Sequence, residues 1–218
     1  MNNRKKIEKS IIEWVGGGFI FLSMISISLL IISNSLFIYQ LVIDYYELPY
    51  ITGITRKALL ANYHEIVKYL QFPWIQELYM PDFPMSQEGR IHFEEVKKIF
   101  QTFNLIFVIF LMSWLIALIK KIKIFSIFEK AANLVFISSG LIAIFIMFDF
   151  NEAFVVFHKI FFNNDYWIFH PSTDPIILAL PEELFMILGL GLLFVLVIQA
   201  LLIKFIGFKK KKKSPSNF

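Results

Sequence analysis

The chain has no cysteine among its 218 residues. This absence excludes a disulfide scaffold, a zinc ribbon and a thiol nucleophile. Charged residues are also scarce, at 17%, where an ordinary globular chain has about 25%. A composition with few charges and 57% hydrophobic residues excludes a disordered tail protein and is too apolar for an ordinary soluble domain.

What the chain has instead is long apolar runs, with a mean hydropathy of +0.66 and 26 Phe. A membrane-spanning helix needs about 20 apolar residues, and four stretches have that length. The first is too long for a signal-peptide core and lacks a small-residue cleavage site, so we expect it to be retained. The sequence therefore predicts an all-α membrane protein, a four-transmembrane-helix bundle.

The basic residues are distributed unevenly between the segments that separate these stretches. The N-terminal segment, the loop between the second and third stretches and the C-terminal end from Lys204 onward carry 14 of the 21 Lys and Arg but only three acidic residues. The other two segments hold seven basic and 14 acidic residues. Because basic loops stay cytoplasmic, both termini are predicted inside. The run Lys209–Lys213 resembles a patch that binds nucleic acid or acidic lipid. A charged run that keeps the end of the last span inside is the favoured interpretation, so no nucleic-acid partner is expected.

These patterns divide the chain into nine segments. They are a cytoplasmic N-terminus (1–18), a first span (19–43), a first extracellular cap segment (44–98), a second span (99–119), a cytoplasmic loop (120–130), a third span (131–148), a second extracellular cap segment (149–183), a fourth span (184–206) and a cytoplasmic basic tail (207–218).

The two outer segments are expected to form a small cap. Leu59, Tyr63, Ile66 and Leu70 share one face of a predicted helix over 58–70. A second helix, 92–100, leads into the second span, with Ser86 as its candidate N-cap. An aromatic helix over 150–162 is expected at the membrane surface. The short β-prone runs 49–55 and 166–169 are candidates for strands that pair over the site.

The chain has four histidines, and the topology places all of them outside. His92 begins the helix into the second span and His158 follows the third span, so the two rings can face each other where antiparallel helices meet. Considered singly, each histidine is more often structural than catalytic. A pair of imidazoles nevertheless suits a reaction in which one group takes a proton and another delivers one, such as the attack of an amine on an ester.

Other chemistries have weaker support. No GxSxG motif is present, and the outer serines Ser86 and Ser172 lie in helix-cap contexts. A metal site built from His158, His170, Asp165 and Asp174 remains an alternative, although no HExxH-type spacing supports it and no metal is expected. The few charged residues within the spans argue against a transporter.

Two segments resemble a known family. The stretch FNEAFVVFHKIFFNNDYWIFHPSTDPIILALPEELF (150–185) contains FHxxFF, NDxW, PxxD and a Pro-Glu before the last span, and HFEEVKKIF (92–100) precedes the second span. Together they resemble the lipoprotein intramolecular transacylases, small four-span membrane proteins of Gram-positive bacteria. The resemblance implies transfer of the sn-2 acyl chain of a diacylglyceryl-Cys to the α-amino group of the same Cys, which gives a lyso-form lipoprotein. It implies a diacylated lipoprotein and membrane lipid as partners, no cofactor and no covalent acyl-enzyme.

By the same resemblance, His92 and His158 fall on the family's catalytic positions, with the roles of base and acid left open. Asp165, Trp167 and Asp174 match motif positions and are interpreted as supporting or structural residues. His170 departs from the pattern and is a poor catalytic candidate, and His64 has no assigned role. Two alternatives stay open at this point: a non-enzymatic four-span accessory or binding protein, which would tolerate the loss of either histidine, and a metal-dependent membrane hydrolase.

Overall fold

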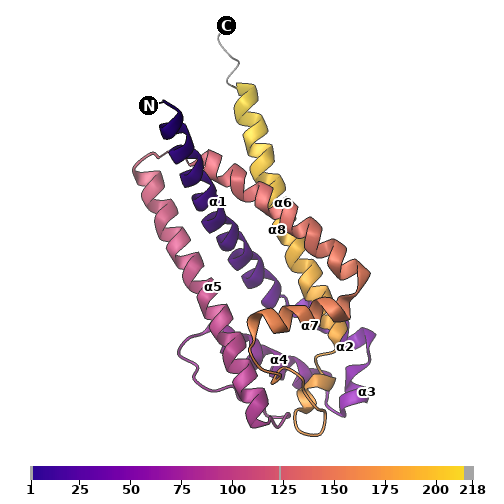
Figure 1. The fold of residues 1–218 in the computed structure, drawn as a ribbon. Coiled ribbons are helices and arrows are strands. Elements are labelled where there is room, and N and C mark those ends of the chain that lie inside the picture. The colour runs from indigo at the N-terminus through magenta and orange to yellow at the C-terminus, as the bar shows by residue number, and fades with distance from the viewer. Residues whose placement is uncertain (1, 123, 214–218) are drawn as a thin grey trace. The chain divides into compact units, whose positions relative to one another are not determined.

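The computed structural model describes residues 2–122 and 124–213. Met1, Lys123 and residues 214–218, which belong to the expected N-terminal segment, cytoplasmic loop and basic tail, lie outside the described residues. The described part of the chain is helical and contains no strand (Figure 1). Its elements are α1 (Asn2–Ser33), α2 (Leu36–Tyr45), α3 (Leu48–Thr52), α4 (Arg56–Gln71), α5 (Gln87–Ile119), α6 (Phe125–Phe148), α7 (Phe150–Phe161), the 3-10 helix η1 (Pro175–Leu178) and α8 (Glu182–Lys213).

These elements form two compact units. The first unit comprises Met1–Leu29, Leu105–Ile144 and Leu192–Phe218, and the second comprises Leu30–Asn104 and Phe145–Gly191. Four described helices are long and apolar enough to cross a membrane: Arg4–Ser33, Gln87–Ile119, Phe125–Phe148 and Glu182–Lys210. Many of their large apolar side chains are exposed, as helices that face lipid require.

The first unit is packed through small and polar side chains, which are the usual contacts between helices in lipid. A Cβ atom on Gly17 of α1 would lie 2.7 Å from Cβ of Lys130, so glycine permits the close approach of α6. Gln199 of α8 donates to Ser28 Oγ of α1 at 2.8 Å, and Lys204 of α8 donates to Asn133 Oδ1 of α6 at 2.7 Å. These bonds satisfy polar groups that would otherwise be unpaired between apolar helices.

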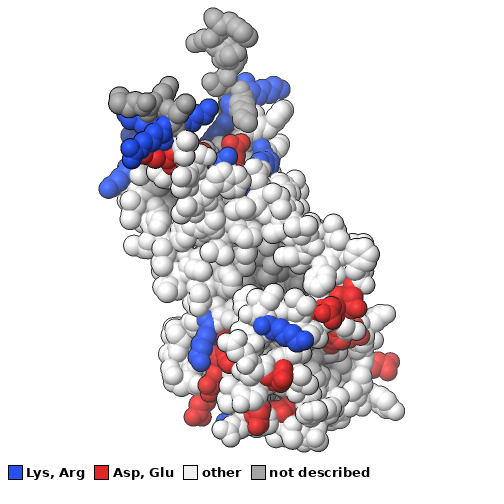
Figure 2. Space-filling view, viewed as in Figure 1, with Lys and Arg blue, Asp and Glu red and all other residues white. Residues whose placement is uncertain are grey.

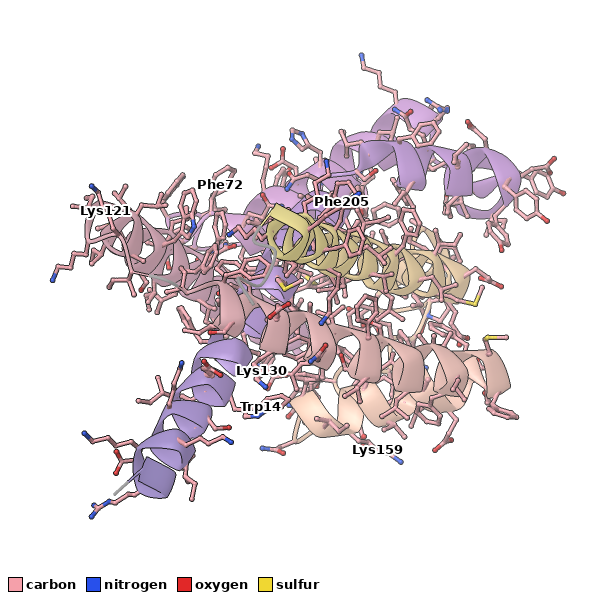
Figure 3. The ribbon with its side chains drawn as sticks, turned by 90° about the horizontal axis from the view of Figure 1, so that it is seen from above. Trp14, Phe72, Lys121, Lys130, Lys159 and Phe205 are labelled. Carbon is pink, nitrogen blue, oxygen red and sulfur yellow. The ribbon has the colours of Figure 1, made fainter. Side chains whose placement is uncertain are left out.

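Basic side chains of the first unit lie over aromatic rings. The Nζ atom of Lys130 is 4.7 Å from the ring centre of Trp14, and the two side chains lie together in Figure 3. The Nζ atom of Lys209 is 4.4 Å from the ring centre of Phe205. In Figure 2, Lys and Arg gather around the ends of this unit's helices, whereas Asp and Glu predominate on the second unit. Aromatic and basic side chains of this kind are typical of membrane-helix ends.

The second unit has its own apolar core, contributed by α2, α3, α4, η1 and the beginnings of α5 and α8. Tyr39 of α2 and Tyr63 of α4 stack with ring centres 4.2 Å apart, and the Tyr39 hydroxyl donates to the Ala179 carbonyl at 3.0 Å. Side-chain amides of Gln101 and Asn104 donate to the carbonyl of Gln71. Side chains of α5 therefore supply hydrogen-bond donors to a carbonyl at the C-terminal end of α4, which has no partner within its own helix. The α4 face predicted from periodicity is buried: Leu59, Tyr63, Ile66 and Leu70 all belong to the core.

Two segments differ from their sequence-based expectation. The stretch 19–43, expected as one span, is divided because α1 ends at Ser33, where the Asn34 amide donates to the Leu30 carbonyl. The apolar residues of α2 then face the core of the second unit, and hydropathy alone does not distinguish a core-facing helix from a lipid-facing one. The β-prone runs 49–55 and 166–169 form part of α3 and an irregular turn segment instead of strands.

Candidate active site

Two helices of the second unit bring two histidines together. His92 lies in the second turn of α5 and His158 in the last turn of α7. Both are buried, at 8% and 7% exposure, and their ring centres are 5.9 Å apart. The rings that the sequence predicted to face each other therefore lie next to each other in one buried cluster. We call this cluster, with the aromatic rings around it, the histidine pocket.

The position of His92 depends on the start of α5. Ser86 Oγ accepts from the Gly89 N–H at 2.9 Å, so the predicted N-cap is confirmed. The Ser86 N–H in turn donates to Asp174 Oδ1 at 2.8 Å, and the Thr173 hydroxyl donates to Asp174 Oδ2 at 2.8 Å. A Cβ atom on Gly89 would overlap Asp174 Oδ1, so this contact requires glycine. Asp174, 4% exposed, therefore anchors the helix end that carries His92.

The ring orientation of His158 is fixed by a backbone bond within α7. The helix begins at an Asp149 cap, whose side chain accepts from the Glu152 N–H at 3.0 Å. One turn before His158, the Phe154 carbonyl lies 2.7 Å from His158 Nδ1. A carbonyl can only accept, so Nδ1 carries the proton and Nε2 holds the free lone pair. The Nε2 atom of His158 is thus the ring nitrogen that is free to accept a proton.

Aromatic rings surround both imidazoles. Phe162 and Phe169 pack against His92, with ring centres at 4.8 and 5.6 Å. Phe154 lies 4.1 Å from His158, and Trp167 stacks on it at 4.5 Å with the planes 26° apart. This apolar environment disfavours a charged imidazolium.

Burial consequently lowers the pKa of both histidines. His92 precedes the apolar stretch 99–119, and burial, with a smaller effect of nearby His158, lowers its pKa to about 4. Burial also lowers the pKa of His158, against a smaller opposing effect of the hydrogen bond to Phe154. The lowered pKa values favour the neutral form of both rings.

The loop after α7 holds Trp167 over His158. Glu95, one helical turn after His92, accepts from the Asn164 amide at 2.9 Å, and Asn164 Oδ1 accepts from the Tyr166 N–H at 3.1 Å. Asn164 thus connects α5 to the turn that precedes Trp167. Asp165 is exposed in that turn, where its backbone carbonyl accepts from the Ile168 N–H at 3.0 Å, so its position suits a turn residue.

The other two histidines lie apart from this pocket, with exposed side chains: His64 on α4 and His170 after the aromatic loop. The residues of the metal alternative are not gathered into one site. Within the described ranges 2–122 and 124–213, no three His, Asp or Glu side chains come close enough to hold a metal ion.

Sequence reasoning missed three contributors to the pocket: Glu95, Gly89 and Phe169. Glu95 shares the face of α5 with His92, three residues away, which is the one local signal for it. No local pattern around Gly89 indicates its importance. Its role depends on Asp174, 85 positions later in the sequence.

Comparison with known proteins identifies the family. The family model described as "Lipoprotein intramolecular transacylase Lit" matches residues 15–185. The chain belongs to the lipoprotein intramolecular transacylase family. It is accordingly an acyltransferase, and the alternative of a non-enzymatic accessory protein is disfavoured. No curated protein matches the chain.

Solved structures of transacylase proteins have the same fold. The membrane integral lipoprotein intramolecular transacylase Lit from Bacillus cereus is 29% identical to this chain, with a TM-score of 0.85 over 96% of this chain and 100% of that one. Two forms of the Bacillus cereus protein in which one histidine is replaced also match. The alanine form has a TM-score of 0.77 at 27% identity, covering 98% and 100% of the two chains. The arginine form has a TM-score of 0.75 at 26% identity, covering 98% of each of the two chains. Together with the four apolar helices, these matches show a multi-pass membrane protein.

Proposed function

We propose that this transacylase moves the sn-2 acyl chain of a diacylglyceryl-modified N-terminal Cys to the α-amino group of the same Cys. The observation that carries the proposal is the buried pair His92 and His158, 5.9 Å apart in an aromatic pocket. An amine that attacks an ester must lose a proton, and the departing glyceryl oxygen must gain one. Two neutral imidazoles at this separation supply both transfers.

The free Nε2 lone pair makes His158 the base in this scheme. It takes the proton of the attacking amine as the C–N bond forms. The C–O bond to the sn-2 oxygen then breaks, and the pair returns a proton to that oxygen, with His92 as the second member. The products are an amide and a free hydroxyl, so the reaction needs neither a cofactor nor an acyl-enzyme. Donor and acceptor belong to one substrate molecule, and this proximity replaces a covalent relay.

We further propose that both termini are cytoplasmic and that the histidine pocket faces outward, near the outer leaflet. This proposal rests on the uneven charge: 13 of the 21 basic residues lie in the three segments assigned inside, and Lys204 lies near the same end of the fourth span. An outer-leaflet site lets the acyl chains of a diacylated lipoprotein remain in lipid while its polar head enters the pocket.

The proposed chemistry is tested with a synthetic diacylglyceryl lipopeptide that carries an isotope-labelled acyl chain at sn-2 only. Purified wild-type protein is expected to place the label on the α-amino nitrogen of the same peptide, as tandem mass spectrometry will show. When labelled and unlabelled peptides of different sequence are mixed, the label is expected to stay with its own peptide. Label on the amine of the other peptide, or amide from the sn-1 chain, would contradict the proposal.

A further inference from the structure

The pocket contains a buried hydrogen-bond donor that the two histidines leave unused. In the described part of the second unit, three buried polar side-chain atoms have no hydrogen-bond partner: His92 Nδ1, Glu95 Oε2 and Trp167 Nε1. Buried polar atoms in native proteins are nearly always paired, so an unpaired one calls for an explanation. All three belong to residues that form the histidine pocket or hold its loop in place.

Of these atoms, Trp167 Nε1 has the most restricted chemistry. Indole N–H is a donor only, whereas a carboxylate accepts and an imidazole nitrogen does either. The Trp167 ring stacks on His158 with ring centres 4.5 Å apart and lies 6.2 Å from Phe154. The unpaired N–H is therefore carried by a ring in direct contact with the residue assigned as the base.

The proposed reaction creates an acceptor that matches this donor. When the amine nitrogen attacks the ester carbonyl carbon, a C–N bond forms and the carbonyl π electrons move to oxygen, which becomes an oxyanion. When the intermediate collapses, that electron pair re-forms the carbonyl and the C–O bond to the glyceryl oxygen breaks. Fixed donors directed at such an oxyanion are a large source of rate acceleration in a site without water. The Nδ1–H of His158 cannot serve, because it is bonded to the Phe154 carbonyl.

We propose that Trp167 is a catalytic residue whose Nε1–H donates a hydrogen bond to the oxyanion of the tetrahedral intermediate. This inference rests on the proposed function and deepens it. It also changes the interpretation of Trp167 from its sequence, which was that of a supporting or structural residue. The stacked ring positions the donor, and the Asn164–Glu95 bond holds the loop that carries it.

The test removes the N–H while keeping an aromatic ring at position 167. Two variants serve: Trp167→Phe, and Trp167 replaced by β-(3-benzothienyl)alanine, which has the shape of tryptophan with sulfur in place of N–H. Trp74→Phe is the matched control, because Trp74 is 71% exposed. Single-turnover rates with the synthetic lipopeptide are measured alongside the affinity for a phosphonate analogue of the intermediate and for an unreactive amide analogue of the substrate.

Both Trp167 variants are expected to lose a factor of about 10²–10³ in the chemical rate. We expect them to lose affinity for the phosphonate but to keep affinity for the substrate analogue, whereas Trp74→Phe matches the wild type. If wild type reacts and His158→Gln does not, but both Trp167 variants stay within about threefold of wild type, the inference is overturned and the proposed function stands. A slow Phe variant with a normal benzothienyl variant would also overturn it, since ring packing would then be the cause. An inactive wild type would overturn both proposals.

Discussion

The Nδ1–H of His158 donates to the carbonyl oxygen of Phe154, one turn earlier on α7, at 2.7 Å. This bond selects the tautomer in which Nε2 holds the free lone pair, on a ring whose centre lies 5.9 Å from that of His92. The local sequence is thus sufficient to orient the ring, because a histidine near the C-terminal end of a helix can bond the carbonyl four residues before it. The approach of His92, in contrast, depends on contacts between distant segments.

The first prediction concerns pH. Burial lowers the pKa of His92 to about 4, whereas an unfolded chain binds this proton near the ordinary value of about 6.5. The unfolded state therefore binds more protons between these values, so stability is fully present above about pH 6.5 and is lost as the pH falls toward 4. The difference corresponds to about 3 kcal/mol. Thermal unfolding in detergent should show a falling midpoint over this range in wild type.

In the same experiment, His92→Gln should flatten this pH dependence, whereas His64→Gln, which changes an exposed ring, should preserve it. Equal slopes in wild type and His92→Gln would show that the buried ring does not contribute to the acid sensitivity.

The second prediction concerns the contact of Gly89 with Asp174. A methyl group at Gly89 would overlap the carboxylate, so Gly89→Ala should destabilise the protein by about 1–3 kcal/mol. It should also lower the acylation rate, because the start of α5 positions His92. The control is Gly140→Ala on α6, where a Cβ atom meets nothing within 4 Å and alanine should stabilise the helix slightly.

A double-mutant cycle identifies the cause. In the Asp174→Ala background, which removes the overlapping carboxylate, the cost of Gly89→Ala should shrink by about 1 kcal/mol or more. Additive effects of the two substitutions would contradict the proposed contact.

The third prediction concerns the bond between Glu95 and Asn164, which joins α5 to the loop that carries Trp167. Because this bond is partly buried and charge-assisted, Asn164→Ala should cost about 1–3 kcal/mol. In the Asn164→Ala background, Glu95→Ala should lower the free energy of unfolding by little more. Hydrogen exchange of residues 163–170 should accelerate in either variant. Unchanged exchange in both would mean that other contacts hold the loop.

The sequence was sufficient to predict most of the helices, because hydropathy, the spacing of Leu59 and Tyr63, and the Ser86 cap are local signals. The proximity of His92 and His158 also followed from the positions of these helices in the chain. The contacts of Asp174 with Ser86 and of Glu95 with Asn164 join residues 88 and 69 positions apart, and such contacts leave no periodic pattern. The end of α1 at Ser33 was also not predictable from hydropathy, because α2 is as apolar as a membrane span but packs into a protein core.

The fourth prediction concerns topology. The chain has no cysteine, so single cysteines report their own location without background. Ser172→Cys in the exposed loop should react with a membrane-impermeant maleimide added to intact cells. Ser10→Cys, exposed on α1, should react only after the cells are permeabilised. The opposite pattern would reverse the proposed orientation and place the histidine pocket inside.

The most direct test of the account is mass spectrometry of the N-terminal peptide of a model lipoprotein. The lipoprotein is expressed in a host that lacks N-acylation, together with wild type, His92→Gln, His158→Gln, His64→Gln or His170→Gln. We predict the N-acylated, S-monoacylglyceryl form with wild type and with both exposed-histidine variants. We predict a loss of at least about 10²-fold in its formation with His92→Gln and His158→Gln, although both proteins reach the membrane. Undiminished N-acylation in His92→Gln and His158→Gln would contradict the central claim that this pair carries the reaction.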